Sequence, residues 1–204
     1  MCSTKVQDGR ARRAAPILLP LLMAGLAACT APRSPTPISA PRIVEASQAM
    51  IMPAPGGPAV ISVIEERFSD GVEQKVVLGT DATNAGQNYL GIRIYGPMER
   101  ETQDLKSLGY KPFTAAALSA ETARAVPGVA MRRSALFLRN NYGPFGYAFS
   151  QTRNGDSCIF GWQQLRSSEA ERRNFRNVGA IQIRLRLCEN GASEKELLAV
   201  MYGY

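Results

Sequence analysis

The sequence predicts a single α+β domain, with a mainly antiparallel sheet and two or three short helices packed on it. Three observations support this prediction: an Asn-Gly turn between strand-forming residues within 145–165, strict apolar-polar alternation along 178–188, and short alanine-rich or capped helical segments between the strands. The expected globular part, residues 42–204, is long enough to bury the core of one domain. A second full domain is not expected.

The first part of the domain is expected to form a hairpin at 60–78, because two segments rich in β-branched residues flank a Ser-Asp-Gly turn. A two-residue loop at Asp70-Gly71 would place Glu66 opposite Lys75, and these charges would mark a solvated surface. A third strand is predicted at 89–95, ending before a Gly-Pro pair.

Helical segments are predicted at 101–108 and at 114–125, the second ending before a proline. They should lie across one face of the sheet, because alanine favours helix without demanding much burial. The stretch 131–139 returns to strand character. Near the end of the chain, Ser-Glu-Lys-Glu at 193–196 has the pattern of a capping box and opens a short helix to about residue 201.

The hairpin at 145–165 has the strongest local turn signal, Asn154-Gly155. A two-residue loop there pairs Tyr147 with Trp162 and places Cys158 on the same face of the sheet. The other members of that face are Phe145, Phe149 and Phe160. We expect this aromatic face to pack as core, with stacking on sugar rings as the alternative for Tyr147 and Trp162.

The strand at 178–188 is predicted to be half-buried, because its residues alternate strictly in polarity. The apolar side carries Ile181, Ile183, Leu185 and Leu187, and the polar side carries Gln182, Arg184, Arg186 and Cys188. A solvated face is the simpler interpretation of the two arginines. The alternative is that Arg184 and Arg186 grip an anionic polymer or a partner.

The first 28 residues have the order of a secretory signal peptide: a basic segment, then an uncharged run at 14–28. That run is shorter than the roughly 20 apolar residues that a membrane-spanning helix needs. Leu26-Ala27-Ala28-Cys29 resembles the bacterial lipobox, which predicts acylation of Cys29 and a permanent membrane anchor. Thr30, in place of Asp, resembles lipoproteins sorted to the outer membrane. Simple secretion after cleavage at Ala27-Ala28 is the alternative.

Residues 29–41 are expected to form a tether, because 30–41 contain four prolines and little that could pack. Past the tether only two cysteines remain, and export would place them in an oxidising compartment. We predict that Cys158 and Cys188 form a disulfide, with two unpaired buried thiols as the alternative. The predicted faces of the two residues conflict, so Cys188 is expected at the end of its strand, where the pleat no longer dictates direction.

The composition argues against most catalytic mechanisms. The chain has no histidine, which excludes Ser-His-Asp and Cys-His sites and the usual zinc sites. No glycine-rich phosphate loop is present. Carboxylates that could hydrolyse a glycosidic bond occur as Glu65, Glu66, Asp70, Glu99 and Glu101, but Glu65 and Glu66 should point to opposite faces of their strand. We therefore expect no enzyme activity, no cofactor and no metal site.

Nucleic acid is not an expected partner. The formal net charge of the chain is +7, and four basic residues and one acidic residue of the first 28 contribute +3 of it. The remaining charge of +4 is scattered along the sequence, so the stripe of basic residues that a nucleic-acid binder carries is missing.

Three segments together resemble the cellulose biosynthesis protein BcsN family of bacterial envelope proteins. They are Phe-Gly-Tyr-Ala-Phe-Ser-Gln-Thr-Arg-Asn-Gly-Asp-Ser-Cys-Ile-Phe-Gly-Trp-Gln-Gln at 145–164, Ile-Arg-Leu-Arg-Leu-Cys at 183–188 and Glu-Leu-Leu-Ala-Val-Met-Tyr-Gly at 196–203. The resemblance covers about residues 42–204 and carries no catalytic signature. It implies a non-catalytic accessory of cellulose or related exopolysaccharide production that acts beside the export machinery.

The resulting hypothesis is a lipid-anchored periplasmic protein of the outer membrane that contacts a protein of a polysaccharide secretion system or the emerging glucan. The rival hypothesis is a general envelope-maintenance lipoprotein that binds cell-wall or outer-membrane proteins. Proximity of the gene to a cellulose synthase operon would favour the first.

Overall fold

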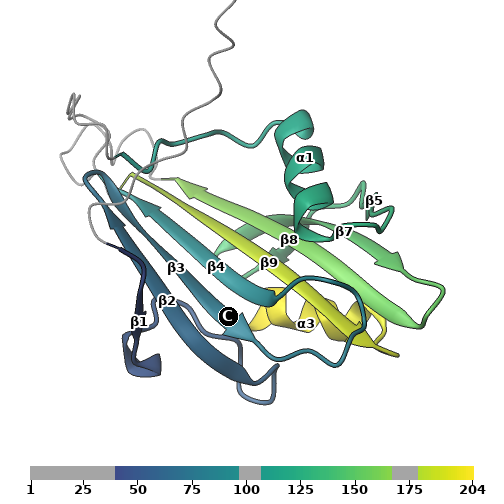
Figure 1. Cartoon of the computed structure of the whole chain (residues 1–204). Helices are drawn as coiled ribbons and strands as arrows, with labels where there is room; N and C mark the ends of the chain where they lie inside the picture. Colours follow the sequence, from purple (N-terminus) through teal and green to yellow (C-terminus); the bar gives the residue numbers. More distant parts are fainter. Residues whose placement is uncertain (1–39, 97–106, 167–178) are drawn as a thin grey trace, which may run out of the picture. The chain divides into compact units, whose positions relative to one another are not determined.

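The computed structural model describes residues 40–96, 107–166 and 179–204. In this part of the chain nine strands form one sheet in the order β1-β2-β3-β4-β9-β8-β7-β5, and β6 pairs with β7 (Figure 1). Every strand pair is antiparallel. The predicted α+β class with a mainly antiparallel sheet is confirmed.

The strands at the centre of the sheet are long, and those at its edges are short. Their bounds are β1 Arg42–Val44, η1 Ala46–Gln48, β2 Val60–Phe68, β3 Gly71–Leu78, β4 Asn88–Tyr95, α1 Ala115–Ala125, β5 Arg132–Arg133, β6 Leu138–Asn140, β7 Gly143–Gln151, β8 Asp156–Arg166, β9 Ala180–Asn190 and α3 Glu194–Gly203. The predicted leader, nearly all of the tether and most of the predicted helix at 101–108 lie outside the described residues.

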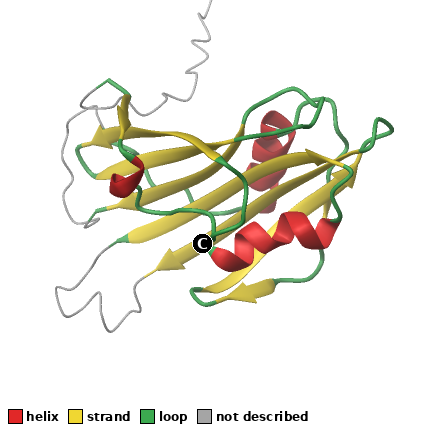
Figure 2. Cartoon of the chain, turned by 90° about the horizontal axis from the view of Figure 1, so that it is seen from below, coloured by secondary structure: helices red, strands yellow, loops and turns green. Residues whose placement is uncertain are grey.

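The two helices cover opposite faces of the sheet (Figure 2). The predicted start of α1 is confirmed, because the Thr114 side chain caps the helix by accepting a hydrogen bond from the Ala117 amide at 3.1 Å. The predicted capping box of α3 is also present, between Ser193 and Glu196. Each helix packs its buried side chains on the sheet face it covers, Leu118 and Thr122 in α1 and Leu197, Leu198, Val200 and Met201 in α3.

The face under α3 holds the main apolar core, formed by Val63, Val76, Leu78, Leu90, Ile92, Phe145, Ile159, Ile183, Leu185, Leu187 and the α3 residues Leu197, Leu198, Val200 and Met201. The face under α1 holds smaller apolar clusters among polar side chains, around Phe160 and Trp162 and around the two cysteines. The sheet is therefore buried on both faces at β8 and β9, which places buried polar residues under α1.

The first hairpin forms at 60–78, but its predicted register is wrong. Phe68 pairs with Gly71, so the loop consists of Ser69 and Asp70 and not of Asp70 and Gly71. This shift places Glu66 opposite Glu73, and Lys75 opposite Ile64. The Asp70 carboxylate is held in the loop by the Leu108 amide, which donates to it at 2.5 Å.

The second hairpin is also shifted by one residue from its predicted register. Thr152 donates to the Asp156 carbonyl at 2.7 Å, so the loop has three residues and ends at Gly155, whose φ of +88° suits glycine. Tyr147 therefore pairs with Gly161 and not with Trp162. The predicted common aromatic face is wrong, because a one-residue slip moves one strand's side chains to the other face.

The one-residue shift also resolves the conflict between the predicted faces of the two cysteines, because it moves Cys158 to the face opposite Tyr147. Cys158 and Cys188 are direct cross-strand partners on the α1 face of β8 and β9, and they form the predicted disulfide, with a Cα–Cα distance of 4.1 Å. The prediction that Cys188 lies beyond the influence of the pleat is wrong, because β9 continues to Asn190. The prediction that this strand is half-buried is also wrong, since the polar side of β9 is buried under α1.

The single strand predicted at 131–139 is replaced by two short strands, β5 and β6, with a bend between them. Both pair with β7, β5 at Ala148–Phe149 and β6 at Gly143–Phe145. In the bend, Leu136 and Phe137 are 69% and 68% exposed. Their strand-forming character is therefore not used for pairing or for packing.

Candidate functional site

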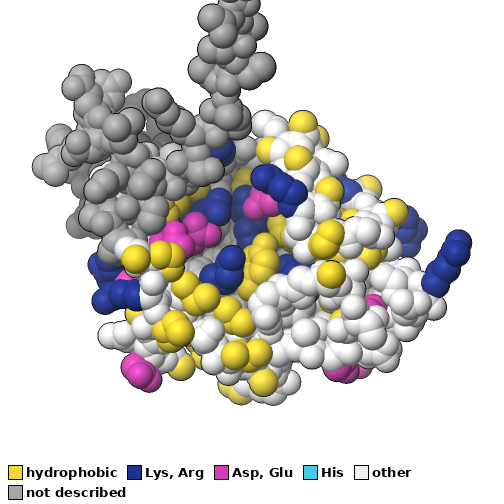
Figure 3. All heavy atoms as spheres, viewed as in Figure 1, with side chains coloured by type: hydrophobic (Ala, Val, Ile, Leu, Met, Phe, Trp, Pro, Cys, Tyr) yellow, Lys and Arg dark blue, Asp and Glu magenta, His cyan; other side chains and the backbone are white. Residues whose placement is uncertain are grey.

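Among the described residues, α1 covers the part of its sheet face over β7, β8 and β9 and leaves β3 and β4 partly open (Figure 1). Lys75 of β3, Gly91 of β4 and Arg184 of β9 lie side by side across these strands. Tyr89 and Arg93 flank Gly91 on the same face. We call these five residues the basic strip. Lys and Arg side chains gather at the centre of this face, between α1 and strands β2 and β3 (Figure 3).

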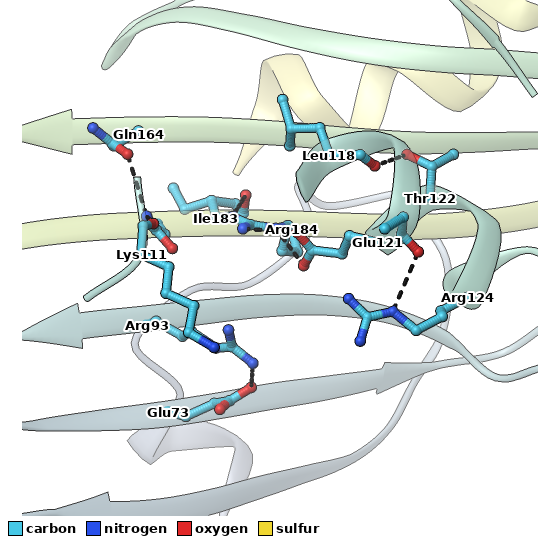
Figure 4. Close-up of polar contacts among 12 residues, drawn as sticks. Glu73, Arg93, Lys111, Leu118, Glu121, Thr122, Arg124, Gln164, Ile183 and Arg184 are labelled. Carbon is cyan, nitrogen blue, oxygen red and sulfur yellow. Dashed lines mark hydrogen bonds and ion pairs between the residues drawn. The ribbon is translucent and has the colours of Figure 1, made fainter. Parts of the chain in front are cut away.

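Arg184 is fixed in the strip by α1. Its guanidinium donates to both carboxylate oxygens of Glu121, at 2.7 Å from Nε and 3.0 Å from Nη2, as Figure 4 shows. The guanidinium carbon lies 4.2 Å from the centre of the Phe113 ring, a distance suited to cation–π attraction. Arg184 is 8% exposed. A bidentate pair of this kind holds α1 to the sheet and leaves little of the cation accessible.

Arg93 is more accessible than Arg184 and pairs with Glu73 across β3 and β4, with Nη2 donating at 3.0 Å (Figure 4). Desolvation by burial acts to lower the pKa of Arg93, but the attraction and the hydrogen bond to Glu73, together with the charges of Tyr95 and Glu121, raise it overall. Lys75 is exposed, and its Nζ lies 5.0 Å from the centre of the Tyr89 ring. Burial raises the pKa of Tyr89.

Lys75 is the cation of the strip that no carboxylate neutralises among the described residues. Of the described carboxylates on this face, Glu73 pairs with Arg93 and Glu121 pairs with Arg184, while Glu66 of the neighbouring β2 makes no ion pair with Lys75. Within the described part of the chain, the strip thus combines one cation without an ion pair, two cations held in fixed geometry and one aromatic ring. Such an arrangement can bind anionic groups of a partner.

The structure brings three of the four predicted contact residues to the α1 face and places the fourth on the other side. Trp162 and Arg184 are cross-strand partners, and Arg186 follows on the same face. Tyr147 lies on the α3 face, within the main core. The alternation predicted that Arg184 and Arg186 are solvated, and this prediction is wrong because both are buried.

Arg186 is 1% exposed, and its guanidinium binds groups inside the protein. Its guanidinium donates four hydrogen bonds, to the carbonyls of Ala125 and Ala85 at 3.0 and 2.8 Å and to the side-chain oxygens of Asn88 and Asn84 at 2.8 and 3.0 Å. Burial lowers its pKa. Arg186 therefore ties α1 and the loop between β3 and β4 to the sheet and presents no surface to a ligand.

Trp162 is buried beneath α1, with the Arg133 guanidinium 5.3 Å from its ring centre. A cavity of about 350 Å³ lies beside it, lined by Leu118, Thr122, Met131, Ala148 and neighbouring residues of α1 and β5. Cα hydrogens of Gly146 face the indole ring, because a Cβ there would lie 2.6 Å from Trp162 Nε1. The tryptophan is thus part of the packing between α1 and the sheet.

The open residues Lys75 and Arg93 were not among the predicted contacts. The hairpin register hid Lys75, since it was expected to pair with Glu66. Arg93 could have been found from the sequence, because Tyr89, Gly91 and Arg93 alternate with Leu90, Ile92 and Ile94 along β4. That alternation places the polar set on one face.

The acidic residues considered for glycosidic hydrolysis do not converge. Glu65 and Glu66 lie on opposite faces of β2, as predicted. The Glu65 carboxylate accepts from Arg42, Gln74 and Arg67 at 2.7 to 2.8 Å, and these hydrogen bonds, Arg42 first, lower its pKa to about 2. Glu65 is thus a buried structural anion. Glu99 and Glu101 lie outside the described residues.

Two carboxyl groups that the sequence did not predict to be neighbours lie where the β3–β4 loop meets the end of β9. Asp81 and Glu189 both line a cavity of about 720 Å³ between α3 and residues 54–59. Burial, and then the Asp81 carboxyl, raise the pKa of Glu189 to about 7, whereas the Asn190 amide lowers that of Asp81. Their separation of more than a hundred residues gave no local signal.

Among the described residues, no group of three or more Cys, Asp or Glu side chains is placed to hold a metal ion. In the same residues no helix has the length and apolar character needed to cross a membrane. The fold and the site define a class of protein built on one large antiparallel sheet, with a basic, aromatic-edged strip on its open face.

Comparison with known proteins gives the family. Residues 50–204 match the family model of cellulose biosynthesis protein BcsN. The match covers most of the chain, so the chain belongs to this family and takes part in cellulose biosynthesis. No curated protein and no solved structure matches the chain significantly.

Proposed function

We propose that the protein is a lipid-anchored, non-catalytic accessory of cellulose production, held at the periplasmic side of the outer membrane through Cys29. Family membership supports the cellulose role, and the lipobox-like Leu-Ala-Ala-Cys supports the anchor. The folded domain then acts by binding a protein of the secretion machinery.

The basic strip is the surface that this proposal assigns to the partner. The observation that carries it is the exposed Lys75, which no described carboxylate neutralises, beside the Arg93–Glu73 pair on an open sheet face. Charges at an interface rim speed association and select a partner of opposite sign. The partner surface is accordingly acidic.

Complementation of a deletion strain tests the anchor and the surface separately. Cys29→Ser should release the protein from the membrane fraction, and cellulose output should fall. Lys75→Glu with Arg93→Glu should leave the protein on the membrane but lower cellulose output. Lys195→Glu is the matched control, because Lys195 is exposed at the start of α3, away from the strip.

Two outcomes would contradict the proposal. A Cys29→Ser protein that stays in the membrane fraction would rule out the lipid anchor. Full cellulose output from the doubly substituted strip would rule out the assigned surface. A deletion strain with normal cellulose but increased sensitivity to detergents would instead support the envelope-maintenance role.

A further inference from the structure

Two aromatic contacts lie where the β6–β7 turn meets the end of α3, Tyr142 with Tyr204 and Tyr202 with Phe145 of β7. Tyr142 lies in the turn, and Tyr202 and Tyr204 lie at the end of the helix, which crosses the sheet face in Figure 2. The Asn140 side chain joins the two elements by donating to the Met201 carbonyl at 2.8 Å. We call Tyr142, Tyr202 and Tyr204 the tyrosine platform.

The rings of the platform are oriented by internal contacts and yet remain accessible. The Tyr142 and Tyr204 rings are stacked, with planes 4° apart and centres 6.0 Å apart. Tyr202 packs edge-to-face on the buried Phe145, with ring centres 5.2 Å apart. Tyr142 is 58% exposed and Tyr202 is 44% exposed. Rings held in this way lose little conformational freedom when a ligand binds.

Two amide side chains lie beside the rings. Asn140 and Gln163 hydrogen-bond each other, with Gln163 Nε2 donating to Asn140 Oδ1 at 2.8 Å, and the Tyr204 hydroxyl donates to Gln163. Burial raises the pKa of Tyr204 to about 12. The phenol therefore stays neutral over the physiological range, and the side chains named here carry no formal charge.

This chemistry suits a neutral polysaccharide. The faces of a pyranose ring carry C–H bonds that pack against the electron-rich face of an aromatic ring, while hydroxyls exchange hydrogen bonds with amide and phenol groups. An anionic or cationic ligand would find no counter-charge on these side chains. The basic strip, on the opposite face of the sheet, has the reverse character.

We infer that the tyrosine platform binds a chain of neutral β-linked glucose. The inference takes the polymer from the family's role in cellulose biosynthesis and depends neither on the lipid anchor nor on the basic strip. The protein would then hold the glucan on the α3 side and its protein partner on the α1 side.

Retention on amorphous cellulose tests the inference, with the full chain purified from membranes in detergent. The wild-type protein should be retained and should be eluted by cellohexaose. Tyr142→Ala and Tyr202→Ala should each weaken binding about two- to tenfold, the range for loss of one aromatic contact, and the double variant should weaken it further. Tyr142→Phe, which keeps the ring, should bind within about twofold of wild type.

Matched controls separate this site from the rest of the protein. Ile61→Ala removes an exposed side chain remote from the platform and should not change retention. Lys75→Glu should also leave retention unchanged, even if it lowers cellulose output in cells. Unchanged tryptophan fluorescence of each variant would show that the fold is intact.

The inference is overturned if the wild-type protein is not retained by cellulose. It is also overturned if folded Tyr142→Ala and Tyr202→Ala variants bind as well as wild type, or if the protein prefers a charged polysaccharide such as alginate over cellulose. If the wild-type protein binds cellulose and the Lys75→Glu, Arg93→Glu variant keeps full cellulose output, the platform is supported and the proposed partner surface is refuted.

Discussion

Replacement of the buried Arg186 by Met tests how the α1 face of the sheet is held together. Methionine has a similar length and keeps most of the apolar contacts, but it removes all four hydrogen bonds that the guanidinium donates. These bonds connect the sheet to the end of α1 and to the loop between β3 and β4. We therefore expect both segments to loosen together.

The magnitude follows from the acceptors that lose their donor. Asn88 Oδ1 still accepts from the Cys188 amide at 2.8 Å, so its loss is partial. The other three acceptors are only partly buried, and water can reach them after local opening. Hydrogen bonds from a charged group contribute about 1.5–3 kcal/mol each. Removal of the buried cation recovers several kcal/mol of desolvation. The net loss of stability should be about 3 kcal/mol.

Urea unfolding, followed by the fluorescence of the single tryptophan, measures this loss at equilibrium. Hydrogen exchange should show the segments around Ala85 and Ala125 losing protection first. Arg186→Lys should cost less, about 1–2 kcal/mol, because an ammonium group can keep some of the bonds. A methionine variant as stable as wild type, or more stable, would refute the reasoning. It would show that the desolvation of an arginine buried without a carboxylate partner costs more free energy than its hydrogen bonds contribute.

Three further predictions concern stability. Cys158→Ala with Cys188→Ala should lower the free energy of unfolding by about 3–4 kcal/mol, because the disulfide closes a loop with a sequence separation of 30; equal urea midpoints for the double variant and the oxidised wild type would contradict this. Gly146→Ala should cost about 1–3 kcal/mol and shift the emission of Trp162, since the added methyl group meets the indole ring; unchanged emission would exclude the clash. Glu189 has its pKa raised to about 7 in the folded state, so the folded protein binds more protons than the unfolded chain between pH 4.5 and 7 and stability should fall as pH rises through that window. Glu189→Gln should flatten this part of the profile in thermal unfolding at several pH values, and a variant with the wild-type slope would contradict the assignment.

Local patterns carry most of the secondary structure. Thr114 and Ser193 cap the two described helices as their side-chain chemistry predicts. The alternation at 178–188 predicts a strand, and the structure has β9 there. These features depend on neighbours within a few residues, so they can be read without knowing the fold.

The candidate site could be predicted only in part. The sequence offered Arg184 as a possible contact residue only as the alternative to a solvated face, and its pairing with Glu121 joins residues 63 positions apart. Lys75 and the tyrosine platform depend on which strands become neighbours and on where α3 ends against the β6–β7 turn. No periodicity within one segment reports such distances.

The sequence by itself determined the class of fold, the presence of both hairpins, the capping box of α3 and the family. Only the tertiary structure decided which face each side chain occupies. The physical reason is the loop at Asn154-Gly155, which includes Arg153 as a third residue and moves every partner across β7 and β8 by one position. That single residue separates Tyr147 from Trp162 and moves Cys158 to the face opposite Tyr147. The separate pairing of β8 with β9 places Cys158 opposite Cys188, and the position of α1 buries Arg184 and Arg186.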